Sequence, residues 1–369
     1  MNIQQNPVEK NVTVMEYVSC NICESCQYDL VYQIDVNYNV MRYYRYARNI
    51  PNKENMTGTF SIVRCKRCRL LFTNPRFIHD AQASVYSSNR ILGGNWKNFM
   101  YLFDQAQNDE CQDLNNEKLL HPDYGWKFDI IRDYAPGKEK TSLLDLGCGT
   151  GHFVLQALEQ GFDAWGVDIS QDRIRYAQQT LKLEDRVQHG KIEEAFPNRT
   201  FDIITLWDVI EHIHDPKALL NSLKQVAHSQ THIFVLTMSI DSITYKLFRK
   251  RWNYINPTQH LFYFSDSTIR ELFARSGWEL LGKTMDDSRS KNFLRLLTKV
   301  IIGQLNNFFF QVYAPISSKF KIFKPLFKPL QKKISDERMQ KRLENLYPGM
   351  YVGRYHDNFV FIGRLKAKT

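Results

Sequence analysis

The sequence lacks any apolar run close to the roughly 18 residues that a membrane-spanning helix needs. Its first ten residues are polar and contain no apolar core of a secretory signal. No segment recurs at a fixed period. With 43% apolar and 24% charged residues, the 369-residue chain has the composition of a globular protein of two or three domains. We therefore expect a cytoplasmic protein without a transmembrane segment.

The central part of the chain also lacks an excess of positive charge. The net charge of +10 arises mainly from residues 289–342, which carry 13 basic and 2 acidic side chains, whereas residues 81–288 carry 22 basic and 28 acidic ones. A mildly acidic centre argues against a nucleic-acid groove, so we do not expect nucleic acid as a partner. In residues 289–333, aromatic side chains alternate with lysines, which favours peripheral contact with an anionic membrane at its inner face. The alternative is a helical hairpin that packs on the core or on a second subunit, and the oligomeric state stays open.

The cysteines lack the even number and the secretory context of a disulfide framework. Four of the seven form two C-x-x-C pairs, and two such turns supply the four thiolates of a closed tetrahedral zinc site. We expect structural zinc at Cys20, Cys23, Cys65 and Cys68. The alternative is a set of ordinary buried thiols, and Cys26 is a spare that could substitute as a ligand.

Five segments are expected along the chain. They are a zinc-ribbon-like module at 1–80, a helical connector at 81–125, an α/β domain at 126–285, a basic amphipathic insertion at 286–350 and a returning final strand at 351–369. In the α/β domain, short apolar runs alternate with helical periodicity, which is typical of a doubly wound sheet with crossover helices. We predict its strands at 142–145, 164–168, 186–189, 202–206, 232–236 and 278–283, and a last strand at 358–363.

Two helices of the α/β domain have clear start signals. Asp215-Pro216 combines an N-cap with proline at the first helical position. Thr268 and Glu271 form a predicted capping box, and Gly277 ends that second helix.

A glycine-rich loop, Asp-Leu-Gly-Cys-Gly-Thr-Gly at 145–151, directly follows a predicted strand. Glycines let the backbone approach a ligand closely, and ligands collect at the carboxyl ends of such strands. The next strand ends at Asp168, whose carboxylate can accept both hydroxyls of a ribose. A dinucleotide would favour G-x-G-x-x-G, whereas Asp145 before this G-x-G-x-G loop would repel a pyrophosphate and can bind the ammonium of a methionine. The charge argument favours S-adenosylmethionine (SAM) over NAD.

The loop 145–151, Asp168 and the stretch 201–213 resemble class I SAM-dependent methyltransferases over about 126–285 and the final strand. The resemblance implies a Rossmann-like SAM-binding sheet, with Asp168 on the ribose hydroxyls and Ile169 and Ile192 beside the adenine. The implied cofactor-binding set is Asp145, Gly147, Cys148, Gly149, Gly151, Asp168, Ile169, Ile192 and Trp207. The chain departs from the family at Lys191, where an acid usually lies near the adenine amino group, and Glu193 is a candidate replacement.

Residues 64–76 resemble the N-terminal zinc ribbon of one branch of these methyltransferases. That branch commonly modifies sugars, lipids or other small metabolites, so the resemblance points to an acceptor of that kind.

Four side chains are candidates for catalysis. Methyl transfer is an in-line displacement that depends on alignment, and a base is needed only when the acceptor must lose a proton. Asp208, Glu211 and His212 follow the fourth strand at i, i+3 and i+4, so a helical turn would place them on one side. His212 is then a candidate base, or the three hold a divalent ion; alternatively, Glu211 and His212 only cap the next loop. His260 lies in an aromatic loop that could cover an acceptor, and a structural role is its alternative.

The sequence thus predicts a SAM-dependent methyltransferase for a small-molecule, sugar or lipid-linked acceptor, with transfer to oxygen, nitrogen or carbon open. One alternative is a zinc-ribbon protein that binds RNA or a protein partner and has an inactive SAM fold. The other is a nicotinamide oxidoreductase.

Overall fold

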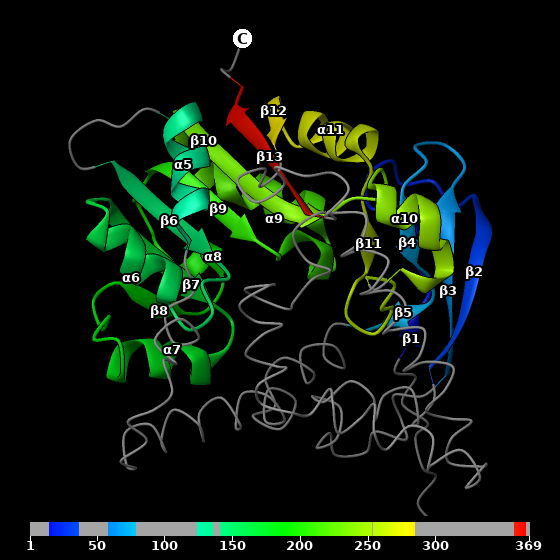
Figure 1. Ribbon diagram of the computed structural model, residues 1–369, viewed down its shortest axis with the longest axis horizontal. Coiled ribbons are helices and arrows are strands. Elements are labelled where there is room, and N and C mark those ends of the chain that lie inside the picture. Colours follow the sequence, from blue (N-terminus) through cyan, green and yellow to red (C-terminus); the bar gives the residue numbers. More distant parts are fainter. Residues whose placement is uncertain are drawn as a thin grey trace, which may run out of the picture.

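The computed structural model describes residues 15–36, 58–78, 124–135, 141–252, 254–284 and 358–366 (Figure 1). Their strands form a seven-stranded sheet, a four-stranded sheet and a two-stranded ribbon. The predicted connector, apart from its last two residues, and the whole predicted insertion at 286–350 lie outside the described residues. No helix among the described residues is long and apolar enough to cross a membrane.

The large sheet has the strand order β12-β13-β10-β9-β6-β7-β8. Its strands are β6 (Ser142–Leu146), β7 (Asp163–Asp168), β8 (Val187–His189), β9 (Phe201–Trp207), β10 (Ala227–Met238), β12 (Trp278–Thr284) and β13 (Asn358–Leu365). β13 lies between β10 and β12 and is antiparallel to both, whereas the pairs among β6 to β10 are parallel. Chain order reverses between β6 and β9, which is where such sheets bind ligands. The predicted Rossmann-like sheet is confirmed.

Helices cover both faces of this sheet. They are α5 (Gly125–Tyr134), α6 (His152–Glu159), α7 (Gln171–Gln179), α8 (Ile192–Ala195), α9 (Pro216–Ser222) and α11 (Asp266–Arg275), with 3-10 turns η3 (Ile210–His212) and η4 (Leu223–Val226). α10 (Ile243–Phe248), which the 3-10 turn η5 (Arg249–Arg251) follows, packs instead with the four-stranded sheet. Alternate residues of each strand point to opposite faces. Leu143 packs with α5, α6 and α7, and its neighbour Leu144 packs with α9 and α11.

The two predicted helix starts have different outcomes. The Asp215 side chain accepts a hydrogen bond from Ala218 N at 2.9 Å, which confirms the N-cap of α9. The predicted capping box at Thr268 and Glu271 is wrong, because α11 begins one turn earlier. Ser265 is its N-cap and Thr268 is the third helical residue, and the two side chains bond each other's backbone N–H groups.

The small sheet joins the N-terminal part of the chain to a distant segment. Its order is β11-β4-β3-β2, with β2 (Tyr28–Val36), β3 (Gly58–Cys65) and β4 (Leu71–Thr73) from the N-terminal part and β11 (Phe262–Tyr263) from the segment after β10. The ribbon of β1 (Met15–Glu16) and β5 (Arg76–Phe77) lies beside it. The sheet is therefore not built from residues 1–80 alone, and its core is continuous with that of α9 and α11.

Candidate functional site

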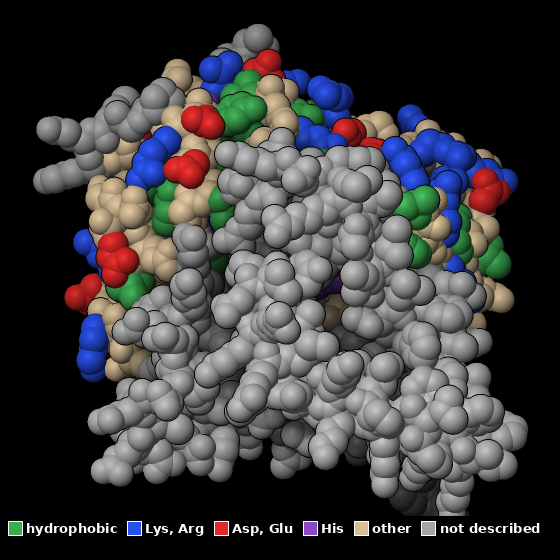
Figure 2. All heavy atoms as spheres, viewed as in Figure 1, with side chains coloured by type: hydrophobic (Ala, Val, Ile, Leu, Met, Phe, Trp, Pro, Cys, Tyr) green, Lys and Arg blue, Asp and Glu red, His purple; other side chains and the backbone are tan. Residues whose placement is uncertain are grey.

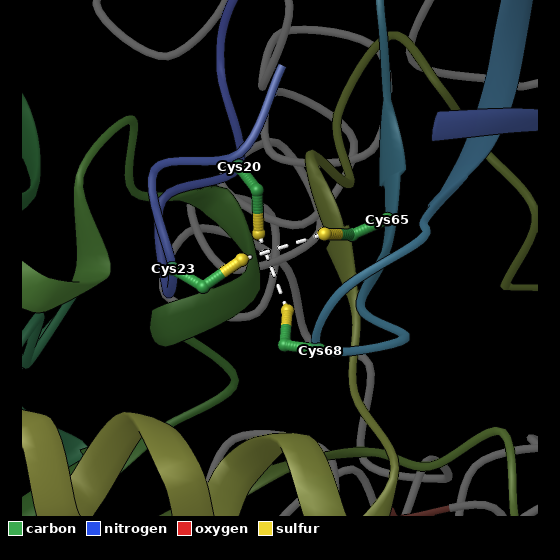
Figure 3. A group of neighbouring side chains, drawn as sticks. All are labelled: Cys20, Cys23, Cys65 and Cys68. Atoms are coloured by element: carbon green, nitrogen blue, oxygen red, sulfur yellow. Dashed lines mark hydrogen bonds between the residues drawn. The ribbon is translucent and has the colours of Figure 1, made fainter. Parts of the chain in front are cut away.

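The four cysteines of the two C-x-x-C pairs converge in one cluster (Figure 3). The Sγ atoms of Cys20 and Cys68 lie 3.4 Å apart, as do those of Cys23 and Cys65, and all four lie within 4.8 Å of one another. Each side chain is at most 8% exposed. Cys26 is exposed and does not belong to the cluster.

The two cysteine turns have the same backbone form. Glu24 N donates to Cys20 O, and Arg69 N donates to Cys65 O, so each turn closes four residues after its first cysteine. Glu24 and Arg69 also share a positive φ, 64° and 69°. The hydrogen bond between the Cys20 and Cys68 sulfurs lowers the pKa of Cys20 to about 5 and, together with burial, raises the pKa of Cys68. Paired turns with crowded sulfurs are the donor set of a closed tetrahedral site, so the cluster is consistent with a zinc-binding module.

The glycine loop between β6 and α6 adopts left-handed backbone at all three glycines. At Gly147, φ is +73°, and a Cβ there would lie 2.7 Å from a methyl carbon of Val209. At Gly149, φ is +56°, and a Cβ would meet only Arg173 Nη1, at 3.9 Å. Gly147 is thus required by its packing, whereas Gly149 faces open space that a ligand can enter.

Two buried acids flank this loop. Asp168 accepts hydrogen bonds from Gly149 N at 2.9 Å and from Ser170 N at 2.8 Å, so the loop holds its carboxylate in place. Asp145 accepts a hydrogen bond from the Thr205 hydroxyl at 2.6 Å. Burial raises the pKa of Asp145 to about 7, and the charge of Asp168 adds to this effect. A cationic ligand at this edge would favour the ionised form of Asp145.

The catalytic candidates split into a group of three and a lone acid. Side-chain atoms of Glu211, His212 and His260 lie within 4.8 Å of one another, although His260 is far away in sequence. Asp208, which has a φ of +56° and is exposed, lies outside this group, and its carboxylate accepts from Asn358 Nδ2 at 3.1 Å. The expected turn with all three residues on one side is therefore not present, because the 3-10 turn η3 begins only after Asp208.

Both histidines of the group are oriented by backbone carbonyls. His212 Nδ1 donates to Gln259 O at 2.9 Å, and His260 Nδ1 donates to Tyr254 O at 2.7 Å. A carbonyl only accepts, so each neutral ring carries its proton on Nδ1 and a lone pair on Nε2. The two ring centroids are 4.9 Å apart.

Glu211 is the third member of the group. Its side chain is 1% exposed, and its carboxylate accepts from the Thr237 hydroxyl at 2.9 Å. Burial, together with the charge of Asp208, raises the pKa of Glu211 to about 8. At neutral pH the carboxyl is therefore largely protonated unless a cation approaches it.

Comparisons with known proteins agree with this geometry. A family described as a methyltransferase domain matches residues 122–282. This chain carries a methyltransferase domain. It is 24% identical over 139 residues to the ubiquinone biosynthesis O-methyltransferase of Photobacterium profundum, which is 36% of this chain and 59% of that protein. To the same enzyme of Aliivibrio fischeri it is 28% identical over 134 residues, covering 34% and 57%. The chain thus matches less than two thirds of the length of these relatives.

Solved structures of similar fold include a SAM-dependent methyltransferase from Clostridium acetobutylicum, with a TM-score of 0.41 and 13% identity over 74% of this chain and all of that one. Another is a methyltransferase of Haloferax volcanii in complex with its activator Trm112, with a TM-score of 0.42 and 12% identity over 68% of this chain and 92% of that one.

Sequence reasoning missed one charged residue of the methyltransferase domain, Lys127. It lies on α5, and its Nζ atom is 4.3 Å from the ring centroid of Trp207 and 4.6 Å from that of Tyr124, with Phe153 at 5.3 Å. Burial lowers the pKa of Lys127 to about 8, although Asp208 and Asp145 attract its charge. The available signal was the position of Lys127 between Trp126 and Phe128, because lysines are almost never buried without a partner.

The remaining cofactor candidates of the methyltransferase domain differ in exposure. Ile169 is 55% exposed directly after Asp168, as a residue that contacts a ligand would be. Ile192 is buried in the core, and Glu193 is exposed. Cys148 packs beneath the loop, where a Cβ on Gly166 would lie 2.7 Å from its sulfur.

Proposed function

We propose that the chain transfers the methyl group of SAM to a small-molecule, sugar or lipid-linked acceptor. The observation that carries the proposal is a pair of buried residues of opposite charge: Asp145, 3% exposed at the start of the glycine loop, and Lys127, 7% exposed, whose charge Asp145 attracts. The methionine end of SAM carries one ammonium and one carboxylate. Asp145 would hold the ammonium and Lys127 the carboxylate, and each buried charge would gain an opposite charge in addition to the other.

The other end of SAM fits the second strand. Asp168 lies at the carboxyl end of β7, and two backbone N–H groups fix its position. A carboxylate has room for further donors after two hydrogen bonds, so Asp168 can accept the ribose hydroxyls. Ile169 and Ile192 would border the adenine.

The histidine pair indicates what kind of acceptor is used. SAM supplies an electrophilic methyl group on a positively charged sulfur. A base helps only an acceptor atom that must lose a proton. We assign His212 Nε2 as the proton acceptor. His260, whose ring is oriented by Tyr254 O, lies beside it, and the buried Glu211 is the third member of the group. A hydroxyl acceptor fits this arrangement, and the relatives named above are O-methyltransferases.

Calorimetry tests the proposal directly. Wild-type protein should bind SAM and S-adenosylhomocysteine and should not bind NAD. Asp168→Asn should lower SAM affinity about 10- to 100-fold, because hydrogen bonds to a charged group contribute about 1.5–3 kcal/mol. Asp172→Asn is the matched control, since Asp172 is a half-buried acid of α7 that pairs with Arg175 one turn later.

Two other results would contradict the proposal. Wild-type protein that binds neither SAM nor S-adenosylhomocysteine at millimolar concentration would be a binding protein with an inactive fold. Binding of NAD alone would indicate an oxidoreductase.

We also infer that the protein binds peripherally to an anionic membrane at its cytoplasmic face. The main support is the basic segment 289–333, which lies outside the described residues. Among the described residues, Lys246, Arg249 and Lys250 are exposed around α10, with Leu247 57% exposed between them. Basic side chains gather over this region in Figure 2. Each lysine or arginine near an anionic surface contributes about 1 kcal/mol.

Co-sedimentation with vesicles of varied anionic content, with RNA as competitor, tests the membrane contact. Bound protein should increase with anionic lipid and decrease with salt. Binding that ignores lipid charge, or that RNA abolishes, would exclude a membrane role for residues 289–333.

A further inference from the structure

The segment 259–264 joins the small sheet to the large one. Thr73, the last residue of β4, is fully buried, and its hydroxyl donates to His260 O at 2.9 Å. Thr73 N donates to Leu261 O, also at 2.9 Å. The next two residues form β11, which pairs with Phe72 and Leu71 of β4 (Figure 1).

The same segment is also attached to the candidate catalytic loop. Leu261 N donates to Glu211 O at 2.8 Å, and Gln259 O accepts from the His212 ring. At its far end, Phe264 O accepts from Ile240 N, just beyond β10. His260 is thus held between the N-terminal part of the chain and the end of the large sheet.

β4 is in turn an extension of the second cysteine turn. Two residues separate Cys68 from the start of β4, and Cys65 N donates to Leu70 O across the turn. Beyond β4, the Arg76 guanidinium donates to His214 O at 2.8 Å, and His214 Nε2 bonds Phe77 O at 2.9 Å. β4 and β5, which follow the second cysteine turn, therefore contact the segments that contain His260 and His212. We call the two cysteine turns together with β4 the four-cysteine module.

We propose that Thr73 is a positioning residue, through which the four-cysteine module sets the place of His260 and, through Gln259, the orientation of the His212 ring. The module is then part of the catalytic site rather than a separate binding domain. Metal bound at the cysteines would fix the second turn and hence the register of β4 against β11. This inference rests on the proposed role of the histidine pair.

Thr73→Val and Thr73→Ser separate positioning from general stability. Valine keeps the shape and the backbone N–H but removes the hydroxyl donor, whereas serine keeps the donor. The readout is the ring signals of His260 and His212 in NMR spectra of histidine-labelled full-length protein, assigned with His260→Gln and His212→Gln. We expect Thr73→Val to move the signals of both rings, because it removes the donor that holds His260 O in the segment contacting His212. Thr73→Ser should restore the wild-type values.

Metal removal is the second arm of the experiment. Treating wild-type protein with a zinc chelator should move the His260 and His212 signals in the same direction as Thr73→Val. SAM affinity should change less than threefold in either case, because the Thr73 hydroxyl donates to His260 O rather than to the glycine loop.

The outcomes are distinguishable from one another. Histidine signals that stay unchanged in Thr73→Val, or that ignore metal removal, would overturn the inference, even if the melting temperature falls. Failure of the wild-type protein to bind SAM would instead refute the proposed function.

Discussion

Replacing Lys127 with methionine should stabilise the ligand-free protein and weaken SAM binding. Burial lowers the pKa of Lys127 from 10.5 to about 8. A shift of this size corresponds to about 3 kcal/mol of unfavourable free energy whenever the lysine is charged in both the folded and the unfolded state. Contacts with the surrounding aromatic rings return about 1–2 kcal/mol. A net cost of about 1–2 kcal/mol therefore remains, and methionine removes it while keeping the apolar stem.

The pH dependence has a defined sign. The folded-state pKa lies below the unfolded one, so the cost is fully present below pH 8 and disappears as the pH rises from 8 to 10.5. Lys127→Met should thus raise the melting temperature by a few degrees at pH 7, at about 2–4 °C per kcal/mol. The difference from wild type should shrink towards pH 10.

Thermal melts with and without SAM check both effects. SAM should raise the melting temperature of the wild type more than that of Lys127→Met, since the variant has lost the partner of the SAM carboxylate. Lys224→Met is the control, because Lys224 is exposed on η4, where it donates to the Asn221 side chain. A Lys127→Met protein that melts below wild type at pH 7, or that binds SAM with unchanged affinity, would refute the reasoning.

Three further predictions follow from the sites described above. Purified protein should contain about one zinc per chain by elemental analysis; Cys65→Ser should lose it and Cys26→Ser should keep it. Gly147→Ala should cost about 1–3 kcal/mol in urea unfolding, because its Cβ would press on Val209 in a left-handed backbone; unchanged stability would contradict the packing. Because the pKa of Glu211 is higher in the folded than in the unfolded chain, its favourable contribution to the free energy of unfolding is lost as the pH rises from 4.5 to 8. Glu211→Gln should therefore gain stability relative to wild type between pH 5 and pH 8 in urea melts, and a constant difference would argue against a buried, protonated carboxyl.

The regular elements of the large sheet could be predicted because their signals are local. Apolar runs ending at Asp145 and Asp168 predicted the ends of β6 and β7 to within one residue. The Asp215-Pro216 start of α9 depends on neighbouring residues alone and was also correct. At α11, two overlapping cap signals compete. Ser265 rather than Thr268 is the N-cap, because the Ser265 side chain accepts a hydrogen bond from Thr268 N in the first turn.

The convergence of distant loops could not be predicted in the same way. His212 and His260 were separate candidates in the sequence, because nothing local indicates that Gln259 O accepts from the His212 ring. β11 is two residues long and belongs to a sheet whose other strands all end at or before Thr73. Such pairing depends on tertiary packing rather than on propensity.

The candidate site is divided between two parts of the chain. The match to a methyltransferase domain covers residues 122–282, which include the glycine loop, Asp168 and Lys127, the groups proposed to hold SAM. The histidine pair is also in that range, but Thr73 and the cysteine turns, which hold His260, are not. The groups proposed to hold SAM therefore lie within the matched range, whereas the backbone of His260 is held in part by Thr73, outside that range.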